Sequence, residues 1–279
     1  MGHSKIPYLD AVYNPILGCD QKMPCSARCW AIKTVANMAR NPKMTESVRF
    51  NAGLVTRIGN VRPEWSGVSA LIESWLSAPL HWRKPQRIGV CFLGDLFAEA
   101  VPLEWQQRVA SVMRDASQHS YYILTKRPGE RMERIARQWG WSHSHNIRVG
   151  VSVCNQAEAD ERIPLLLQTP AAQRWISIEP MTGPVNLTDY VSLNGTCFNR
   201  AGMTSSLSWV VCGAESGPSR RPCPWSWVER VVKHCEAAGV KCWTKQLDYR
   251  SRSVIDTPIE RVIHPGDPAW PAWAKQEQP

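Results

Sequence analysis

Short apolar segments alternate with amphipathic ones from residue 86 onward, and this alternation limits the possible folds more than any other feature of the chain. The apolar segments read as strands and the segments between them as helices. Strands that are apolar almost throughout are typical of a parallel sheet covered on both faces. The expected strands are residues 87–95, 121–128, 148–155, 174–180, 208–217 and 240–246, and the expected helices are residues 104–118, 130–139, 157–167 and 225–238.

Upstream, residues 10–17 read as a first strand and residues 30–40 as its helix, which gives about seven β/α units. The pattern predicts an α/β fold class, a partial or full (β/α) barrel with parallel strands. A doubly wound open sheet is the alternative. We expect a single domain over residues 1–250, with insertions at residues 45–86 and 187–207, the second of them irregular. Residues 251–279, whose last part contains four prolines, form a C-terminal extension that is expected to be non-helical.

Three cysteines, Cys19, Cys25 and Cys29, lie on one loop at residues 18–30, between the first expected strand and its helix. Three thiolates on one loop can hold three irons of a [4Fe–4S] cluster and leave the fourth iron open. A structural zinc site would need a fourth ligand, such as Cys223 or a histidine. The odd number of ligands therefore favours a cluster, with zinc as the alternative.

Four other cysteines lie inside strand-like apolar runs, where a free thiol behaves as a small buried hydrophobic group. They are Cys91, Cys154, Cys212 and Cys242. Buried free thiols and an iron–sulfur cluster both suit a reducing compartment. The chain shows no signal-peptide pattern and no apolar run of ~20 residues that could cross a bilayer, so we expect a cytoplasmic protein without a membrane partner.

The formal net charge of +9 favours a polyanionic substrate or partner, although a solvated basic surface would give the same number. Three tryptophans in the first insertion, Trp65, Trp75 and Trp82, stand among basic residues. Aromatic side chains interleaved with cations are what a platform for single-stranded nucleic acid needs. The simpler interpretation is a basic lid over the barrel.

Polar side chains follow most of the expected strands, at the edge where parallel α/β folds place their sites. They are Asp95, Thr125, Lys126, Arg127, Ser152, Asn155, Glu179, Glu215, Ser216, Lys245 and Gln246. The chain has no G-x-G-x-x-G fingerprint, Walker A loop, H-E-x-x-H or G-x-S-x-G motif. Nucleotide hydrolysis, zinc proteolysis and serine hydrolysis are therefore unsupported.

Several stretches along residues 13–247 carry a resemblance to a known family. They include Cys29-Trp30-Ala31, Gly94-Asp95-Leu96-Phe97, Leu124-Thr125-Lys126-Arg127-Pro128, Ser177-Ile178-Glu179-Pro180 and Gly213-Ala214-Glu215-Ser216-Gly217. With the three-cysteine loop, they resemble a phage-associated three-cysteine protein family of unsettled function that is grouped with the radical S-adenosylmethionine (SAM) superfamily. The resemblance implies a phage- or prophage-encoded enzyme in a bacterial host.

The same resemblance implies a [4Fe–4S] cluster on Cys19, Cys25 and Cys29 and SAM as second cofactor. It suggests six SAM-binding residues: Trp30, Asp95, Lys126, Ser152, Glu179 and Glu215. Trp30 would stack near the adenine, Asp95 would accept from the SAM amino group, and Lys126 would hold a carboxylate or phosphate. Ser152, Glu179 and Glu215 would meet ribose hydroxyls or the substrate. No catalytic residue is assigned.

Each of these residues also has a plain structural interpretation: Trp30 in the core, Asp95 as a helix cap, Lys126 in a solvated turn. The middle cysteine stands one position earlier than in the phage-associated family, where Ser26 lies here, and the usual Gly-Gly-Glu after the second strand is absent.

We therefore expect a radical SAM enzyme that modifies a substrate by hydrogen abstraction, with a nucleic acid or nucleotide as the leading substrate class. It would need an electron donor and could need a partner protein. One alternative is a nucleic-acid-binding protein that holds a cluster or zinc without SAM turnover. The other is an acid–base or phosphate enzyme that uses Glu179, Glu215 and Lys126, with purely structural cysteines.

Overall fold

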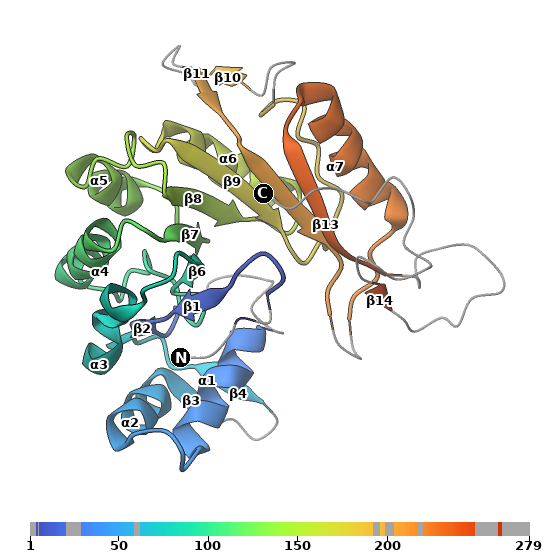
Figure 1. Cartoon of the computed structure of the whole chain (residues 1–279). Coiled ribbons are helices and arrows are strands. Elements are labelled where there is room, and N and C mark those ends of the chain that lie inside the picture. Colours follow the sequence, from blue (N-terminus) through green and yellow to red (C-terminus); the bar gives the residue numbers. More distant parts are fainter. Residues whose placement is uncertain are drawn as a thin grey trace. The chain divides into compact units, whose positions relative to one another are not determined.

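The computed structural model describes residues 4, 6–20, 29–58, 62–191, 196–198, 204–216, 220–248 and 262–263. The chain divides into two compact units (Figure 1). Unit 1 consists of Met1–Arg148 with Pro170–Ala172, and unit 2 consists of Val149–Thr169 with Gln173–Pro279. The single domain expected over residues 1–250 stays a prediction.

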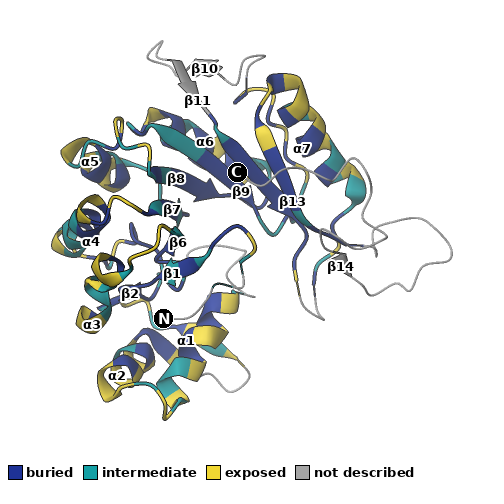
Figure 2. Cartoon of the chain, in the orientation of Figure 1, coloured by how far each residue is buried: buried dark blue, intermediate teal, exposed yellow. Residues whose placement is uncertain are grey.

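Unit 1 is built on three parallel strands in the order β1 (Ala11–Tyr13), β6 (Arg87–Val90) and β7 (Ser120–Thr125). Helices α4 (Leu103–Asp115) and α5 (Glu130–Gln138) follow β6 and β7. Figure 2 shows that the strands are buried and that each helix is buried along one side only. This amphipathic pattern is the one that the sequence shows at helical spacing.

The expected first strand, residues 10–17, is divided into two. β1 joins the parallel sheet, whereas β2 (Ile16–Leu17) pairs antiparallel with β5 (Ala70–Leu71). The division occurs at Asn14 and Pro15. Proline has no N–H to donate to a ladder, and the Asn14 side chain accepts a hydrogen bond from the Leu93 main chain at 3.1 Å. The prediction of one continuous strand was therefore wrong.

Helix α1 (Trp30–Arg40) and the first insertion form a small module of unit 1. The insertion holds α2 (Glu46–Val55), the antiparallel pair β3 (Thr56–Ile58) and β4 (Pro63–Trp65), α3 (Glu73–Leu76) and a 3-10 helix at Ala78–His81. Trp65 is 7% exposed and packs into the core of this module with Ile32, Val35 and Val48. Its place in a nucleic-acid platform is therefore wrong, because its ring fills the module's core.

Unit 2 is built on β8 (Ile147–Ser152), β9 (Gln173–Ile178), β12 (Trp209–Gly213) and β13 (Lys241–Asp248), in that order. The pairs β9–β12 and β12–β13 are parallel. Helices α6 (Gln156–Gln168) and α7 (Trp225–Ala238) belong to the same unit. Helix α7 ends at Gly239, whose φ of 67° is the left-handed conformation that glycine adopts most readily.

Two short pairs complete the described part of unit 2. The insertion expected to be irregular contains an antiparallel pair, β10 (Thr196–Phe198) with β11 (Thr204–Ser206). In the C-terminal extension, β14 (Val262–Ile263) pairs antiparallel with β13, and residues 249–261 and 264–279 lie outside the described residues.

The predicted α/β class with parallel strands and flanking helices is confirmed. The four cysteines expected inside strands are buried: Cys212 and Cys242 lie in β12 and β13, whereas Cys91 and Cys154 lie just after β6 and β8. Among the described residues, no helix combines the length and the apolar character that crossing a membrane requires.

A buried ion pair fixes the end of β8 in unit 2. On α6, Glu158 and Arg162 are four residues apart and form a 3.0 Å ion pair with side chains 8% and 1% exposed. Arg162 also donates to the Ser152 carbonyl at 2.6 Å, and Glu158 accepts from the Cys154 N–H at 2.8 Å. The helix therefore holds the main chain at both sides of the strand end.

We predict that Arg162→Met lowers the free energy of unfolding by about 3–5 kcal/mol, because it leaves the Glu158 carboxylate buried without its cation. The matched control is Arg134→Met, which breaks the exposed pair that Arg134 makes with Glu130 at the same spacing on α5. That loss should be about 0.3–0.5 kcal/mol. Urea unfolding of both variants measures the difference, and equal losses would contradict this role of the pair.

Candidate functional site

The cysteine loop joins the end of β2 to the start of α1. Cys19 stands at its start and Cys29 at its end, as the residue that precedes α1; both side chains are partly buried against the core of the module. Residues 21–28, which include Cys25, lie outside the described residues. The structure therefore places the first and last of the three predicted ligands.

Two glycines attach the start of this loop to the turn after β6. Gly18 and Gly94 form a parallel bridge, and the Gly18 carbonyl accepts from the Asp95 N–H at 3.3 Å. Gly18 has a φ of +100°, and a Cβ at Gly94 would lie 2.7 Å from the Gly18 carbonyl oxygen. Neither position accepts a side chain without rearrangement.

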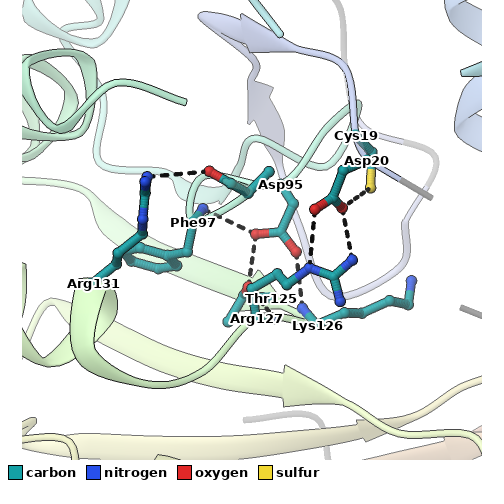
Figure 3. A network of polar contacts seen from close by, with 9 residues as sticks. Cys19, Asp20, Asp95, Phe97, Thr125, Lys126, Arg127 and Arg131 are labelled. Atoms are coloured by element: carbon teal, nitrogen blue, oxygen red, sulfur yellow. Dashed lines mark hydrogen bonds and ion pairs between the residues drawn. The ribbon is translucent and has the colours of Figure 1, made fainter. Parts of the chain in front are cut away.

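Asp95 ties the ends of β6 and β7 together (Figure 3). Its carboxylate accepts from the Thr125 hydroxyl at 2.6 Å, from the Lys126 N–H at 2.9 Å and from the Phe97 N–H at 3.0 Å. The side chain is 5% exposed. Burial raises the pKa of Asp95 above its usual value, and the hydrogen bonds from Thr125, Lys126 and Phe97 oppose that rise. The carboxylate thus holds a turn and the next strand end and does not cap a helix, since α4 begins only at Leu103, and a role for Asp95 in SAM binding stays a prediction.

Asp20 and Arg127 form an ion pair beside Cys19. Their side chains meet at 2.7 Å and 3.3 Å and are 11% and 20% exposed. Figure 3 shows this pair next to the Asp95 network, with the Lys126 side chain pointing away from Asp95. The sequence analysis did not consider Asp20, although an acidic residue next to a predicted metal-ligating cysteine was a usable signal. Arg127, one of the polar residues expected at this edge, has a carboxylate partner in Asp20.

Trp30 is the first residue of α1 and is 56% exposed. The interpretation that places it in the core is therefore wrong. Buried residues of α1 are Ala31, Ile32, Val35 and Ala36, so the Trp30 ring lies outside the face that packs. An exposed indole at the end of the cysteine loop is available to a planar ligand.

The remaining predicted residues lie in unit 2, where two carboxylates end neighbouring strands. Glu179 follows β9 and pairs with Lys245 of β13 at 2.9 Å. Glu215 follows β12 and is held by the Arg221 guanidinium at 3.0 Å through each of two nitrogens. Ser152 ends β8, and its side chain is buried.

Unit 2 thus pairs each predicted carboxylate with a cation, as burial requires. Arg221 was not predicted as a partner of Glu215. The two residues are six positions apart, which is not a spacing at which side chains of one helix or strand regularly meet. The buried ion pair of Arg220 and Asp248 was not predicted either; the two side chains meet at 3.2 Å and are 4% and 0% exposed.

The residues of unit 1 suit an iron–sulfur cluster in their chemistry. Thiolates are soft ligands that such clusters prefer. Cys29 makes no side-chain cap bond to α1 and the first turn of α1 has no acidic residue, so among the described residues no carboxylate of the first turn offsets the partial positive charge of this helix end, which would favour a bound anion. Among the described residues, no three His, Cys, Asp or Glu side chains are grouped as metal ligands, and the predicted set includes Cys25 outside them.

We predict that thiol alkylation separates the loop cysteines from the structural ones. Burial raises the pKa of Cys91 to about 12 and that of Cys223 to about 12, so neither is a thiolate at pH 8. In the metal-free native protein, iodoacetamide should modify Cys19 and Cys29 first, as mass spectrometry of peptides would show. In urea all four should react. Native Cys91 reacting as fast as Cys19 would contradict the structure.

We also predict the pH dependence of an Asp95→Asn variant. At pH 7 it should be about 1–3 kcal/mol less stable, because an amide cannot accept all three hydrogen bonds. The raised pKa means that the folded wild type binds a proton at a pH where the unfolded carboxyl, with a pKa of about 3.9, does not. Lowering the pH from 7 to 4 should therefore stabilise the wild type relative to the variant. Urea unfolding at three pH values measures this, and a difference that shrinks would contradict it.

Comparison with known proteins adds a family. No curated protein and no solved structure matches the chain. A family model described as "Protein of unknown function (DUF5131)" matches residues 3–261, which is nearly the whole sequence. The chain therefore belongs to this family, whose function its description leaves open.

Proposed function

We propose that the protein is a radical SAM enzyme that acts on a nucleic acid or nucleotide. The observation that carries the proposal is the attachment of the cysteine loop to the carboxyl end of β6. The Gly18–Gly94 bridge brings Cys19 beside the Asp95 network and the Asp20–Arg127 pair. Parallel α/β folds bind their ligands at this edge.

In this proposal, Cys19, Cys25 and Cys29 hold a [4Fe–4S] cluster. Reductive cleavage of SAM to methionine and a 5′-deoxyadenosyl radical, which takes hydrogen from a substrate, is the chemistry that such a cluster supplies when it is bound. Three ligands leave one coordination position for SAM. An external electron donor is required.

The chain's own residues then bind and position. Trp30 offers an exposed ring for the adenine at the end of the loop. Asp95 acts as a positioning residue, because its two oxygens already accept three hydrogen bonds that set the main chain at Lys126. Lys126 offers a cation to a carboxylate or phosphate. Ser152, Glu179 and Glu215 of unit 2 stay predictions as residues that bind hydroxyl groups.

We expect protein purified without oxygen to contain about four irons and matching sulfide per chain. With dithionite and SAM it should form 5′-deoxyadenosine. Cys25→Ala should lose both the iron and the product, because two loop thiolates do not hold a cluster that three hold. Chromatography of the reaction and iron analysis measure the two quantities.

The matched control is Cys235→Ala, which removes a buried thiol from α7. It should keep both iron and product. Zinc in place of iron, or an intact cluster that leaves SAM uncleaved under reduction, would reject the proposal and favour the binding-protein alternative. Activity that survives removal of all metal would favour acid–base chemistry instead.

A further inference from the structure

The chain carries no acidic residue between Asp20 and Glu46, whereas five cations, Lys22, Arg28, Lys33, Arg40 and Lys43, lie in that interval. The interval covers most of the cysteine loop and all of α1. Such a one-sided charge attracts a polyanion, and no carboxylate within the interval neutralises it.

The exposed residues of α1 form a single face of the helix. Trp30, Lys33, Thr34, Asn37 and Arg40 are exposed and recur at intervals of three, one, three and three residues. The buried residues of α1 lie on the opposite side and pack into the module's core. Residues at this spacing line up along about 15 Å of helix.

The cations of this face are available to a ligand. Among the described residues, neither Lys33 nor Arg40 has an ion-pair partner, whereas exposed arginines such as Arg108, Arg134 and Arg137 are paired with glutamates. Figure 2 shows exposed stretches along α1. The face therefore presents two unneutralised cations, an amide at Asn37 and, at the loop end, a half-exposed indole.

We propose that this face of α1, with Trp30, Lys33, Asn37 and Arg40, binds single-stranded nucleic acid. Lys33 and Arg40 contact phosphates, and one face of the Trp30 ring stacks on a base at the end next to Cys29, which leaves the other face for the adenine of SAM. The bases of a single strand are free to stack on an aromatic ring such as that of Trp30. The bases of a duplex are already stacked on one another, and an acidic peptide has no need of an aromatic ring. The inference rests on the proposed function for one point only, that the bound strand is the substrate.

The test is fluorescence anisotropy of a labelled 20-nucleotide single strand with the full-length protein, without SAM or reductant. Lys33→Ala/Arg40→Ala should flatten the dependence of log K on log[KCl] by about 1.4, because each lost phosphate contact removes about 0.7. Trp30→Ala should weaken binding about 5- to 150-fold and leave the salt slope unchanged. Equal iron content and thermal stability verify that the variants are folded.

The matched control is Arg83→Ala/Lys84→Ala, which removes the same charge from two exposed residues of unit 1 outside α1. It should keep the wild-type slope. A control that weakens binding as much as the α1 variant would overturn the proposal, as would a Trp30→Ala variant with wild-type affinity. Duplex DNA or polyglutamate competing as well as the single strand would also overturn it.

The assay separates this surface from the radical chemistry. Binding that follows the predicted pattern in a protein that never forms 5′-deoxyadenosine would keep the α1 surface and reject the proposed function. Formation of 5′-deoxyadenosine without single-strand binding would support the proposed function and reject the α1 surface as a binding site.

Discussion

Main-chain contact between Gly18 and Gly94 joins the cysteine loop to the turn after β6, and the arrangement of the edge of unit 1 depends on it. The contact needs two residues without side chains, one of them in the left-handed conformation. Asp95 follows directly and binds the next strand end through Thr125 and Lys126. Cys19, a buried carboxylate and two cations are thereby brought to one edge.

The buried Asp95 carboxylate of unit 1 and the two predicted carboxylates of unit 2 are stabilised differently. In unit 1, the Asp95 carboxylate is held by one hydroxyl and two N–H groups, so its charge is dispersed among dipoles. In unit 2, Glu179 and Glu215 each have a full cation partner. A ligand hydroxyl that approaches Glu215 competes with a bidentate guanidinium, which is a strong interaction. The carboxylates of Glu179 and Glu215 are therefore neutralised within unit 2 itself.

Most of the fold could be predicted from the sequence, because apolar strands and amphipathic helices are local patterns. Helix α7 with its terminal Gly239, and α4 with its apolar spacing, follow from a few residues each. The break in the first strand had one local signal, Pro15, but its other cause, the hydrogen bond between Asn14 and Leu93, joins residues 79 positions apart and could not be predicted. Trp65 was misjudged because neighbouring arginines in the sequence say nothing about which side of β4 is buried.

The sequence could predict which residues belong to the candidate site but not which of them contact one another. Cysteine spacing and polar residues at strand ends indicate where chemistry is concentrated. They do not show that Asp20 turns to Arg127, 107 positions later, or that Asp95 has its oxygens engaged. These contacts join segments that lie far apart in the sequence, so no local sequence pattern predicts them.

The main-chain contacts that hold the cysteine loop determine which parts of the sequence can change in evolution without altering the sheet. The described anchors of the loop are the main-chain bridge from Gly18 to Gly94 before Cys19 and the start of α1 directly after Cys29. Substitutions that keep Gly18, Gly94 and the buried side of α1 preserve these described anchors. The sheet and the ends of the loop are thus fixed by residues other than the cysteines, so the two can change separately in evolution.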